Sequence, residues 1–350
     1  MLFSLGLSTL LNLVAVTIAK KYSLVAVTRE DRWHKSKVAL HGGVAIFFTI
    51  IISALISMLF KEWHNPEIVI LIAISCACFL GLADDIFHLG AFSKLSTEII
   101  ISSVLIFFGV KFQIFEWNFL NIVLTYFWLI GITNALNIID NMDGLSSGVS
   151  LLIISSLFIY KKLFLTSLSN SNVEIILAIL FGSIAGFWLL NKKPARIFLG
   201  DSGSLMIGML LASITLATFY PEGSKEFTGD FSYLSFFVIV TLFTYPIFDT
   251  IFVSIGRYKA GSPIFQGGTD HSSHKLVILG FTEKQAVLIV YVIQLLGGIV
   301  ILSIAYFKSV WEMTFITFMM LLLCFGLFLK KKKSQAKCDF ELVTKPEENL

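Results

Sequence analysis

The chain has 350 residues, of which 56% are hydrophobic and only 14% are charged, and its formal net charge is +3. Soluble domains have about 45 to 50% apolar and about 25% charged residues, so this composition argues against a soluble protein. It predicts an all-helical membrane protein, because a hydrocarbon layer about 30 Å thick requires helices of about 20 apolar residues. The net charge decides nothing alone, and we expect no nucleic-acid partner.

Apolar runs between polar breaks predict about eleven membrane-spanning helices. In chain order they lie near residues 2–19, 38–60, 67–83, 95–110, 119–136, 145–163, 173–190, 203–220, 232–255, 285–306 and 310–329. The first run lacks a basic leading segment and a clear cleavage site, so we interpret it as a helix and not as a signal peptide. Residues 1–333 are expected to form one transmembrane domain and residues 334–350 a polar cytoplasmic tail.

The basic residues are divided unevenly between two alternating sets of loops. One set holds 20 of the 26 Lys and Arg residues and consists of residues 20–37, 83–97, 134–147, 191–201, 256–285 and 330–350. Loops rich in Lys and Arg stay in the cytoplasm. We therefore expect the N-terminus outside and the C-terminus inside.

Acidic residues gather on the predicted cytoplasmic side. They are Asp84, Asp85, Asp140, Asp143, Asp201, Asp249 and Asp270. Charges near the low-dielectric region cost several kcal/mol unless they are paired, hydrated or bound to a cation. Lys94 is the only base in the loop 83–97, and the loop 134–147 has none. A divalent cation or a basic substrate would relieve this excess of carboxylates. The oxygen-only surroundings favour Mg²⁺, with Mn²⁺ as a substitute, which binds carboxylates together with substrate phosphates.

The run "FLGDSGS" at 198–204 strengthens the prediction of a phosphate site. Gly200 and Gly203 allow a tight turn around Asp201, just before an apolar helix whose first amides can face an anion. The bases upstream, Lys192, Lys193 and Arg196, are candidates to bind a diphosphate.

Structural readings of these residues stay open. A single Asp can cap a helix or pair with Lys94. Asn134 and Asn137 can satisfy backbone groups where a helix breaks as readily as they can contact a substrate.

The last predicted cytoplasmic loop carries His271 and His274, whose spacing places both rings on one helical face. Hydrogen bonds to phosphate or sugar oxygens are favoured over zinc, because further Cys or His ligands are lacking nearby. We interpret His34, His41 and His88 as ordinary loop residues, and we assign no role to His64 on the outer side.

Six motifs in this order resemble the polyprenyl-phosphate N-acetylhexosamine-1-phosphate transferases, which are of the glycosyltransferase family 4 type. They are "HGGVAIF" at 41–47, "GLADD" at 81–85, "NALNIIDNMDGL" at 134–145, "ARIFLGDSGSLMIG" at 195–208, "YPIFDTIFVSIGR" at 245–257 and the loop with the two histidines. Eleven spans and a long tail look more like the undecaprenyl-phosphate N-acetylglucosaminyl 1-phosphate transferase branch than the related ten-span phospho-N-acetylmuramoyl-pentapeptide transferases.

The resemblance implies transfer of a sugar 1-phosphate from a UDP-N-acetylhexosamine, above all UDP-N-acetylglucosamine, to undecaprenyl phosphate. The reaction would release UMP, require Mg²⁺ and start a lipid-linked envelope glycan at the cytoplasmic face of a bacterial inner membrane. A direct attack assisted by an Asp is favoured over an aspartyl-phosphate intermediate, although the sequence does not separate the two. A homodimer stays open, as do two rival functions, a pentapeptide transferase and a transporter of an anion or a divalent cation.

Site roles follow from the same resemblance. Asp201 would be the metal ligand, and the catalytic residues would be Asp84, Asp85, Asp140 and Asp143. The substrate-binding residues would be Lys94, Asn134, Asn137, Arg196, His271 and His274.

The chain also departs from the family pattern. Phe92 and Glu98 stand where relatives often have Lys and Gln, and the histidine loop reads "DHSSHKL" in place of H-x-H-H. The chemistry is expected to survive, whereas the accepted sugar is in greater doubt.

Overall fold

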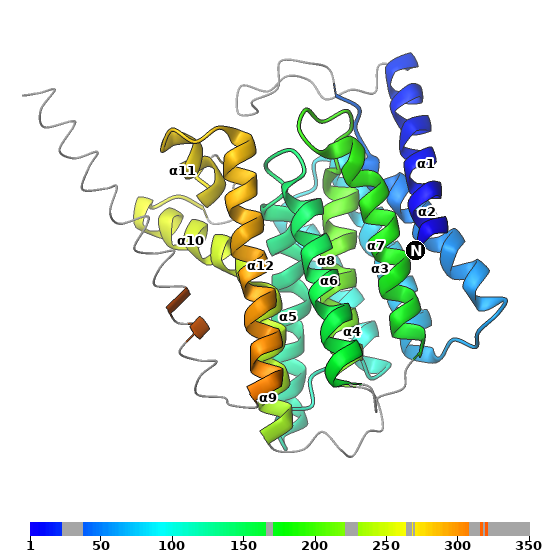
Figure 1. Cartoon of the computed structure of the whole chain (residues 1–350), viewed down its shortest axis with the longest axis vertical. Helices are drawn as coiled ribbons and strands as arrows, with labels where there is room; N and C mark the ends of the chain where they lie inside the picture. The colour runs from blue at the N-terminus through cyan, green and yellow to red at the C-terminus, as the bar shows by residue number, and fades with distance from the viewer. Residues whose placement is uncertain are drawn as a thin grey trace, which may run out of the picture.

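The computed structural model describes residues 1–22, 38–165, 171–220, 230–263, 268, 270–307, 316–317 and 319–320. His34, the tail 334–350 and most of the predicted span 310–329 lie outside these residues. The described part contains twelve helices and no strand apart from one isolated bridge (Figure 1). The helices are α1 Leu2–Lys21, α2 Gly42–Met58, α3 Asn65–Phe87, α4 Ala91–Phe107, α5 Asn118–Ile138, α6 Leu145–Phe164, α7 Ser171–Asn191, α8 Gly200–Phe219, α9 Asp230–Leu242, α10 Thr244–Ala260, α11 Ser272–Ile278 and α12 Glu283–Phe307.

The structure confirms an all-helical protein with many apolar spans. Among the described residues, seven helices are long and apolar enough to cross a membrane, and an eighth span results if the bent pair of α9 and α10 counts as one. This number is lower than the predicted eleven, partly because α2 and α4 have only 17 residues each. The orientation of the chain across the bilayer stays a prediction.

The predicted span 232–255 is not one straight helix, because α9 and α10 meet at an angle of 73°. A side chain from α12 satisfies the backbone at the break. Gln294 accepts a hydrogen bond from the Tyr245 amide at 3.3 Å and donates one to the Leu242 carbonyl at 2.8 Å. A broken helix is tolerated in a membrane protein where neighbouring side chains replace its lost backbone bonds.

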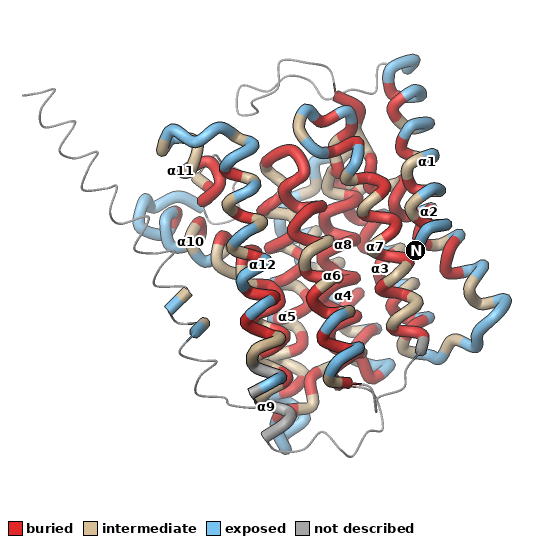
Figure 2. The backbone as a smooth tube through the Cα atoms, in the orientation of Figure 1, coloured by how far each residue is buried: buried red, intermediate tan, exposed pale blue. Residues whose placement is uncertain are grey.

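Helix α8 forms the centre of the bundle, and 94% of its apolar 18-residue stretch is buried. It lies among the other long helices, and the buried residues follow it through the middle of the molecule (Figures 1 and 2). Glycines allow this close packing. A Cβ atom at Gly43 would lie 2.2 Å from the Gly203 backbone nitrogen, and one at Gly81 would lie 2.2 Å from the Asp201 carbonyl oxygen. The absent side chains therefore let α2 and α3 touch the first turn of α8.

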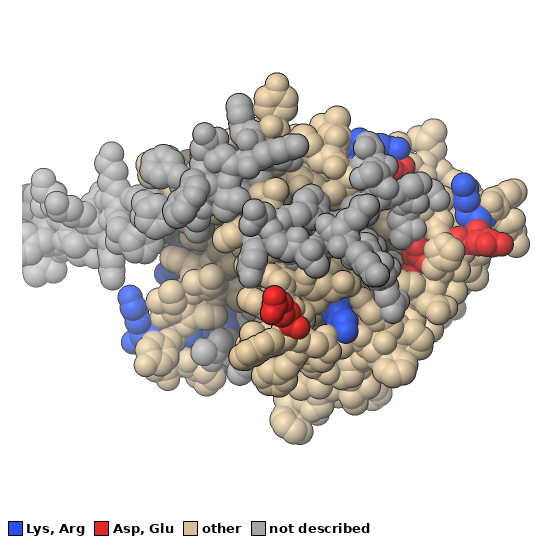
Figure 3. All heavy atoms as spheres, turned by 90° about the horizontal axis from the view of Figure 1, so that it is seen from below, with Lys and Arg blue, Asp and Glu red and all other residues tan. Residues whose placement is uncertain are grey.

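The two ends of the bundle differ. The ends of α3 and α5 and the start of α8 lie toward the upper end in Figure 1, on the same side as α11. Figure 3 shows the opposite end, where the charged side chains of the described residues stand in a few separate groups.

Candidate functional site

Two distant motifs are joined by backbone hydrogen bonds at the upper end of the bundle. Ala39 and Ile197 form a parallel bridge. The Phe198 amide donates to the Ala39 carbonyl at 2.9 Å, and the Gly42 amide donates to the Phe198 carbonyl at 2.9 Å. This pairing places the segment that leads into α2 beside the residues that lead into α8.

The first turn of α8 is capped by a side chain from α3. The Asp201 amide donates to Asp85 Oδ1 at 3.0 Å, and the Ser202 amide donates to Asp85 Oδ2 at 3.1 Å. Helix N-termini attract anions because their first amides lack intrahelical partners. Gly200 permits the approach, since it has φ +74° and a Cβ atom there would lie 2.8 Å from Asp85 Oδ2. The sequence predicted a substrate anion at the first amides of this helix, whereas in the structure the Asp201 and Ser202 amides donate to the carboxylate of Asp85.

His41 belongs to the same cluster, although the sequence suggested an ordinary loop residue. Its Nδ1 lies 3.5 Å from Asp85 Oδ2. His41 precedes α2 with a left-handed backbone, φ 65°. The signal that could have found it is its place at the head of the motif "HGGVAIF".

Lys94 stands between two carboxylates. Its Nζ lies 2.5 Å from Asp84 Oδ2 and 3.6 Å from Asp201 Oδ2. Three Asp residues therefore meet where α3 reaches α8, and a single ammonium group from α4 offsets the repulsion between two of them.

The polar run 134–145 reaches this cluster through Asn137. Its Nδ2 donates to Asp201 Oδ1 at 3.0 Å and to Ser204 Oγ at 2.8 Å. Asn137 thereby fixes Oδ1 of Asp201, the predicted metal ligand, while Oδ2 of the same carboxylate faces Lys94. Sequence reasoning did not single out Ser204, although it lies one helical turn after Asp201.

The next part of the run is tied to the segment before α8. Asp143 is buried, and its Oδ2 accepts a hydrogen bond from the Ala195 amide at 3.0 Å. Asn191 Oδ1 accepts the Gly144 amide at 3.1 Å, and its Nδ2 donates to the Ile197 carbonyl at 2.9 Å. Asp143 thus helps to shape the wall of the site.

An open pocket of about 110 Å³ connects these residues. It is lined by Leu40, Asp85, Asn137, Asp140, Asn141, Met142, Asp143, Phe198, Gly200, Asp201 and Glu283. Asp84 and Lys94 do not line it but are joined to it through Asp201.

Several predicted substrate-binding residues lie away from this pocket. Arg196 is exposed and does not line it. Asn134 donates to Glu98 Oε2 at 2.8 Å. Lys193 contacts Glu283, which does line the pocket, and burial together with the Lys284 ammonium lowers the pKa of Lys193 against the attraction of Asp143.

The histidine loop is attached to α10. Asp249 is fully buried; its Oδ2 lies 3.0 Å from His271 Nδ1, and its Oδ1 accepts the Ser272 amide at 2.8 Å. Arg257 binds Asp270 through two hydrogen bonds of 2.8 Å, which hold the pKa of that carboxyl below its usual value.

The same loop also reaches the polar run. Ser273 Oγ donates to Asn141 Oδ1 at 2.9 Å, and Asn141 lines the pocket. His271 and His274 are buried, with ring centroids 5.8 Å apart. Neither histidine lines the pocket, so the structure brings the loop to the site through Ser273.

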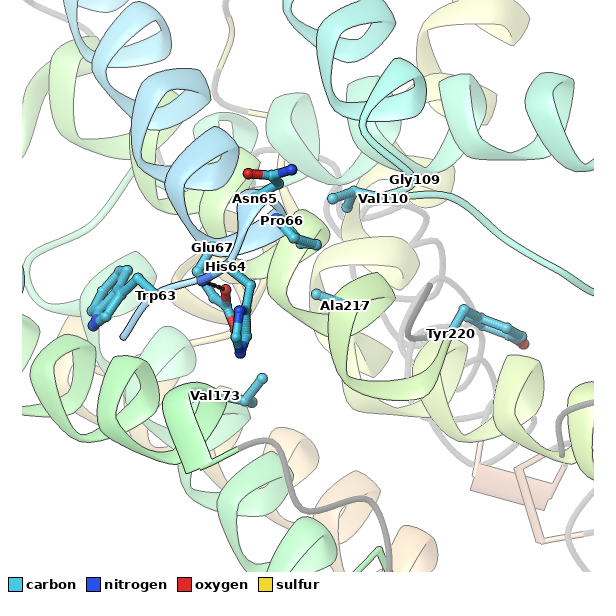
Figure 4. A pocket seen from close by; sticks show the side chains of 10 residues that line it. All are labelled: Trp63, His64, Asn65, Pro66, Glu67, Gly109, Val110, Val173, Ala217 and Tyr220. Carbon is cyan, nitrogen blue, oxygen red and sulfur yellow. Dashed lines mark hydrogen bonds between the residues drawn. The ribbon is translucent and has the colours of Figure 1, made fainter. Parts of the chain in front are cut away.

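A larger pocket of about 460 Å³ lies at the other end of the bundle (Figure 4). Its walls include His64, Asn65, Glu67 and Tyr220. Glu67 caps the start of α3 by accepting the His64 amide at 2.6 Å. None of the predicted site residues lines this pocket.

The pocket lined by Asp140 and Asp201 offers oxygen ligands of the kind that Mg²⁺ prefers. The described residues contain no group of three or more His, Cys, Asp or Glu arranged as a complete metal site. Mg²⁺ does not need one, because it usually binds one or two carboxylates and takes its other ligands from water and substrate phosphates. Asp201, with Asp84 beside it and Asp140 on the pocket wall, fits this donor set.

Comparison with known proteins agrees with the family resemblance of the motifs. Residues 67–219 match the model of the family described as "Glycosyl transferase family 4". A Bacillus subtilis protein named "Probable undecaprenyl-phosphate N-acetylglucosaminyl 1-phosphate transferase" is 29% identical over 91% of this chain and 88% of its own. A Mycobacterium leprae "Decaprenyl-phosphate N-acetylglucosaminephosphotransferase" is 26% identical over 78% of this chain and 75% of its own.

A relative named for a different activity matches as well. A "Phospho-N-acetylmuramoyl-pentapeptide-transferase" of Lactobacillus johnsonii is 27% identical over 78% of this chain and 87% of its own. The matched region contains the cluster of Asp84, Asp85, Asn137 and Asp201 described above. Residues 67–219 thus resemble glycosyl transferase family 4, in agreement with the resemblance of the motifs.

Proposed function

We propose that this protein transfers a sugar 1-phosphate from a UDP-N-acetylhexosamine, with UDP-N-acetylglucosamine the favoured donor, to a polyprenyl phosphate, and that it releases UMP. The observation that carries the proposal is the cluster of Asp84, Lys94, Asn137 and Asp201 at one end of an apolar bundle. Relatives named for N-acetylglucosaminyl 1-phosphate transfer to undecaprenyl or decaprenyl phosphate support it.

The reaction joins two anions. An oxygen of the lipid phosphate attacks the β-phosphorus of the sugar nucleotide, the new P–O bond forms, and the bond between the β-phosphorus and the bridging oxygen breaks to release UMP. A phosphate monoester has a second pKa near 6, so the lipid phosphate is largely dianionic at pH 7 and needs no strong base. Catalysis then rests on positioning and on offsetting negative charge.

We propose that Asp201 holds Mg²⁺, with Asp84 or Asp140 as the nearest second carboxylate. When bound, the ion would offset the charge of the diphosphate and of the leaving UMP. Asn137 keeps the Asp201 carboxylate in place, and Lys94 keeps Asp84 beside it. Mn²⁺ is the expected substitute, since both ions take oxygen ligands.

The hydrogen bonds of Asp85 favour direct attack by the lipid phosphate. Both of its carboxylate oxygens accept amides of α8, which lowers their reactivity as nucleophiles. A covalent aspartyl-phosphate at Asp85 would also require the cap of α8 to open.

The location of the site suits a lipid substrate. Each methylene of a polyprenyl chain buried in the bilayer contributes about 0.8 kcal/mol, which keeps the chain in the membrane while its phosphate reaches the interface. We propose that the protein resides in a bacterial cytoplasmic membrane with the Asp cluster facing the cytoplasm, as the division of Lys and Arg favours. Contact between two copies through lipid-facing helices is a further expectation.

Two other functions make different predictions. A phospho-N-acetylmuramoyl-pentapeptide transferase, the activity named for the Lactobacillus johnsonii relative, would use a UDP-linked muramoyl pentapeptide and ignore the free hexosamine donors. A transporter would release no UMP. Transporters also place their ionisable groups near the bilayer midplane, whereas this cluster lies at helix ends.

The test is UMP release by the detergent-purified protein with undecaprenyl phosphate, a panel of UDP-N-acetylhexosamines and the UDP-linked muramoyl pentapeptide, each with and without Mg²⁺. Release with one hexosamine donor, dependent on both lipid and Mg²⁺, is the expected result. Release only with the pentapeptide donor would favour the first rival. A folded protein that releases no UMP with any donor would contradict the proposal.

A further inference from the structure

Four carboxyl groups near the site share one basic side chain. They are Asp84 and Asp85 on α3, Glu98 on α4 and Asp201 on α8. Lys94 is the only Lys or Arg on the helices α3, α4, α5 and α8, all of which are described in full. Its ammonium group is placed on Asp84 and Asp201, whereas Asp85 is held by backbone amides and lies near His41. Among the described residues, Glu98 forms no ion pair with Lys94 and instead accepts a hydrogen bond from Asn134.

The environment of Glu98 disfavours a negative charge. The side chain is only 2% exposed, and Oε2 accepts a hydrogen bond from Asn134 Nδ2 at 2.8 Å. Oε1 is buried and has no hydrogen-bond partner among the described residues. Burying an ionised carboxylate with an unsatisfied oxygen is much more costly than burying its neutral form.

We propose that Glu98 is a positioning residue that works as a neutral carboxylic acid. Its carbonyl oxygen accepts the hydrogen bond from the Asn134 amide. Because the side chain carries no charge, it does not attract the Lys94 ammonium group away from Asp84 and Asp201. The inference deepens the proposed function and rests on it. It also explains how Glu can occupy a place where relatives often have Gln, because a neutral carboxyl offers the same carbonyl acceptor to Asn134.

Loss of the proton from Glu98 to water would disturb the site through Lys94. The two residues are separated by four positions on α4, the spacing at which a Lys and a Glu form an ion pair on a helix. The other groups on the packed helices that face Lys94 are Asp84 and Asp201, both carboxylates, and α5 contributes only the Asn134 amide. An ionised Glu98 would therefore compete with Asp84 and Asp201 for the single ammonium group.

The first test compares Glu98→Gln, Glu98→Ala and wild type in UMP release as a function of pH. Glu98→Gln should stay within about threefold of wild type at pH 7 and should lose less activity at alkaline pH, because its side chain cannot ionise. Glu98→Ala should lose roughly tenfold or more, as expected for a residue that supports a binding group. Glu116→Gln, an exposed change at the other end of the bundle, is the matched control and should follow wild type.

Several results would overturn the proposal. These are an inactive Glu98→Gln that still folds, an alkaline loss in Glu98→Gln equal to that of wild type, or a fully active Glu98→Ala. Melting temperatures separate a lost fold from a lost function.

A second readout does not depend on turnover. The infrared spectrum of wild type at pH 7 should contain the carbonyl band of a protonated carboxylic acid that is absent from Glu98→Gln and present in Glu116→Gln. If wild type released no UMP with any donor but showed this band, the transferase proposal would fail while the neutral state of Glu98 would stand. The absence of any difference between the spectra of wild type and Glu98→Gln would refute the neutral state itself.

Discussion

Asn137 on α5 donates a hydrogen bond to Asp201 on α8, with 3.0 Å between Asn137 Nδ2 and Asp201 Oδ1. This bond joins the polar run 134–145 to the motif "GDSGS", which lies more than 50 residues later in the chain. A second bond from the same amide group, to Ser204 Oγ at 2.8 Å, fixes its orientation. The carboxylate expected to hold Mg²⁺ is therefore oriented by a neighbouring helix.

Replacing Asn137 by Ala should lower UMP release by about 10- to 100-fold, because partners that orient a metal ligand typically contribute that much to metal affinity or activity. The loss should be partly recovered at higher Mg²⁺ concentration. UMP release measured over a Mg²⁺ titration tests this. Asn118→Ala, an exposed change at the other end of α5, is the control and should leave the titration curve unchanged. A normal curve for Asn137→Ala would contradict the role of this hydrogen bond.

Replacing Asp85 by Ala should reduce the stability of the bundle as well as its activity. Hydrogen bonds to charged groups contribute about 1.5 to 3 kcal/mol, and the variant would leave the Asp201 and Ser202 amides without their acceptor. Thermal unfolding in detergent should show a lower midpoint for Asp85→Ala, and Asp85→Asn should lie between it and wild type because its side-chain carbonyl still accepts one amide. An unchanged midpoint for both variants would refute the capping role.

Replacing Gly81 by Ala should disrupt the approach of α3 to α8. The new methyl group would lie 2.2 Å from the Asp201 carbonyl oxygen, so the two helices must separate. Overpacking of this kind costs about 1 to 3 kcal/mol and should displace Asp84 and Asp85 from Asp201. Gly131→Ala on α5 is the matched control, because nothing lies within 4 Å of its added Cβ. The two variants are compared by thermal unfolding and UMP release, and equal effects would contradict the predicted contact.

The histidine loop should make the stability of the fold depend on pH below neutrality. Burial and the neighbouring His271 lower the pKa of His274, against the attraction of Asp249 and Asp270. The unfolded chain then binds a proton at about pH 6.5 that the folded loop does not accept. Stability is full above this pH and is lost as the pH falls through it toward the lower folded value. His274→Gln should therefore lose less stability than wild type between pH 7.5 and 5.5, as measured by thermal unfolding; parallel curves would refute this.

The sequence predicted most of the helices and the gathering of Asp84, Asp85 and Asp201 at one end of the bundle, because apolar runs mark spans and the acidic motifs lie at their ends. Sequence alone could not show that Asp85 caps α8, since the bond depends on the approach of α3 that Gly81 permits. The break between α9 and α10 was also missed. The segment is apolar throughout, and the side chain that satisfies its free backbone groups, Gln294, lies about 50 residues away.

Residues that reach the site indirectly were the hardest to place. His271 and His274 share a helical spacing typical of a binding pair, yet Asp249 holds His271 away from the pocket wall. Arg196 precedes the "GDSGS" motif in sequence but is exposed outside the pocket. The position of a residue next to a motif in the sequence does not show whether its side chain faces the pocket or the solvent.

The most direct test of the proposed transfer follows the β-phosphate of the donor. The purified protein is incubated with undecaprenyl phosphate, Mg²⁺ and UDP-N-acetylglucosamine labelled with ³²P in the β-phosphate, beside an Asp201→Asn variant of unchanged melting temperature. Sugar 1-phosphate transfer predicts that the label moves into the lipid fraction with wild type, that unlabelled UMP is released, and that Asp201→Asn gives neither. Label that stays in the nucleotide fraction as UDP, or transfer by Asp201→Asn at the wild-type rate, would contradict the proposed chemistry and the role of Asp201.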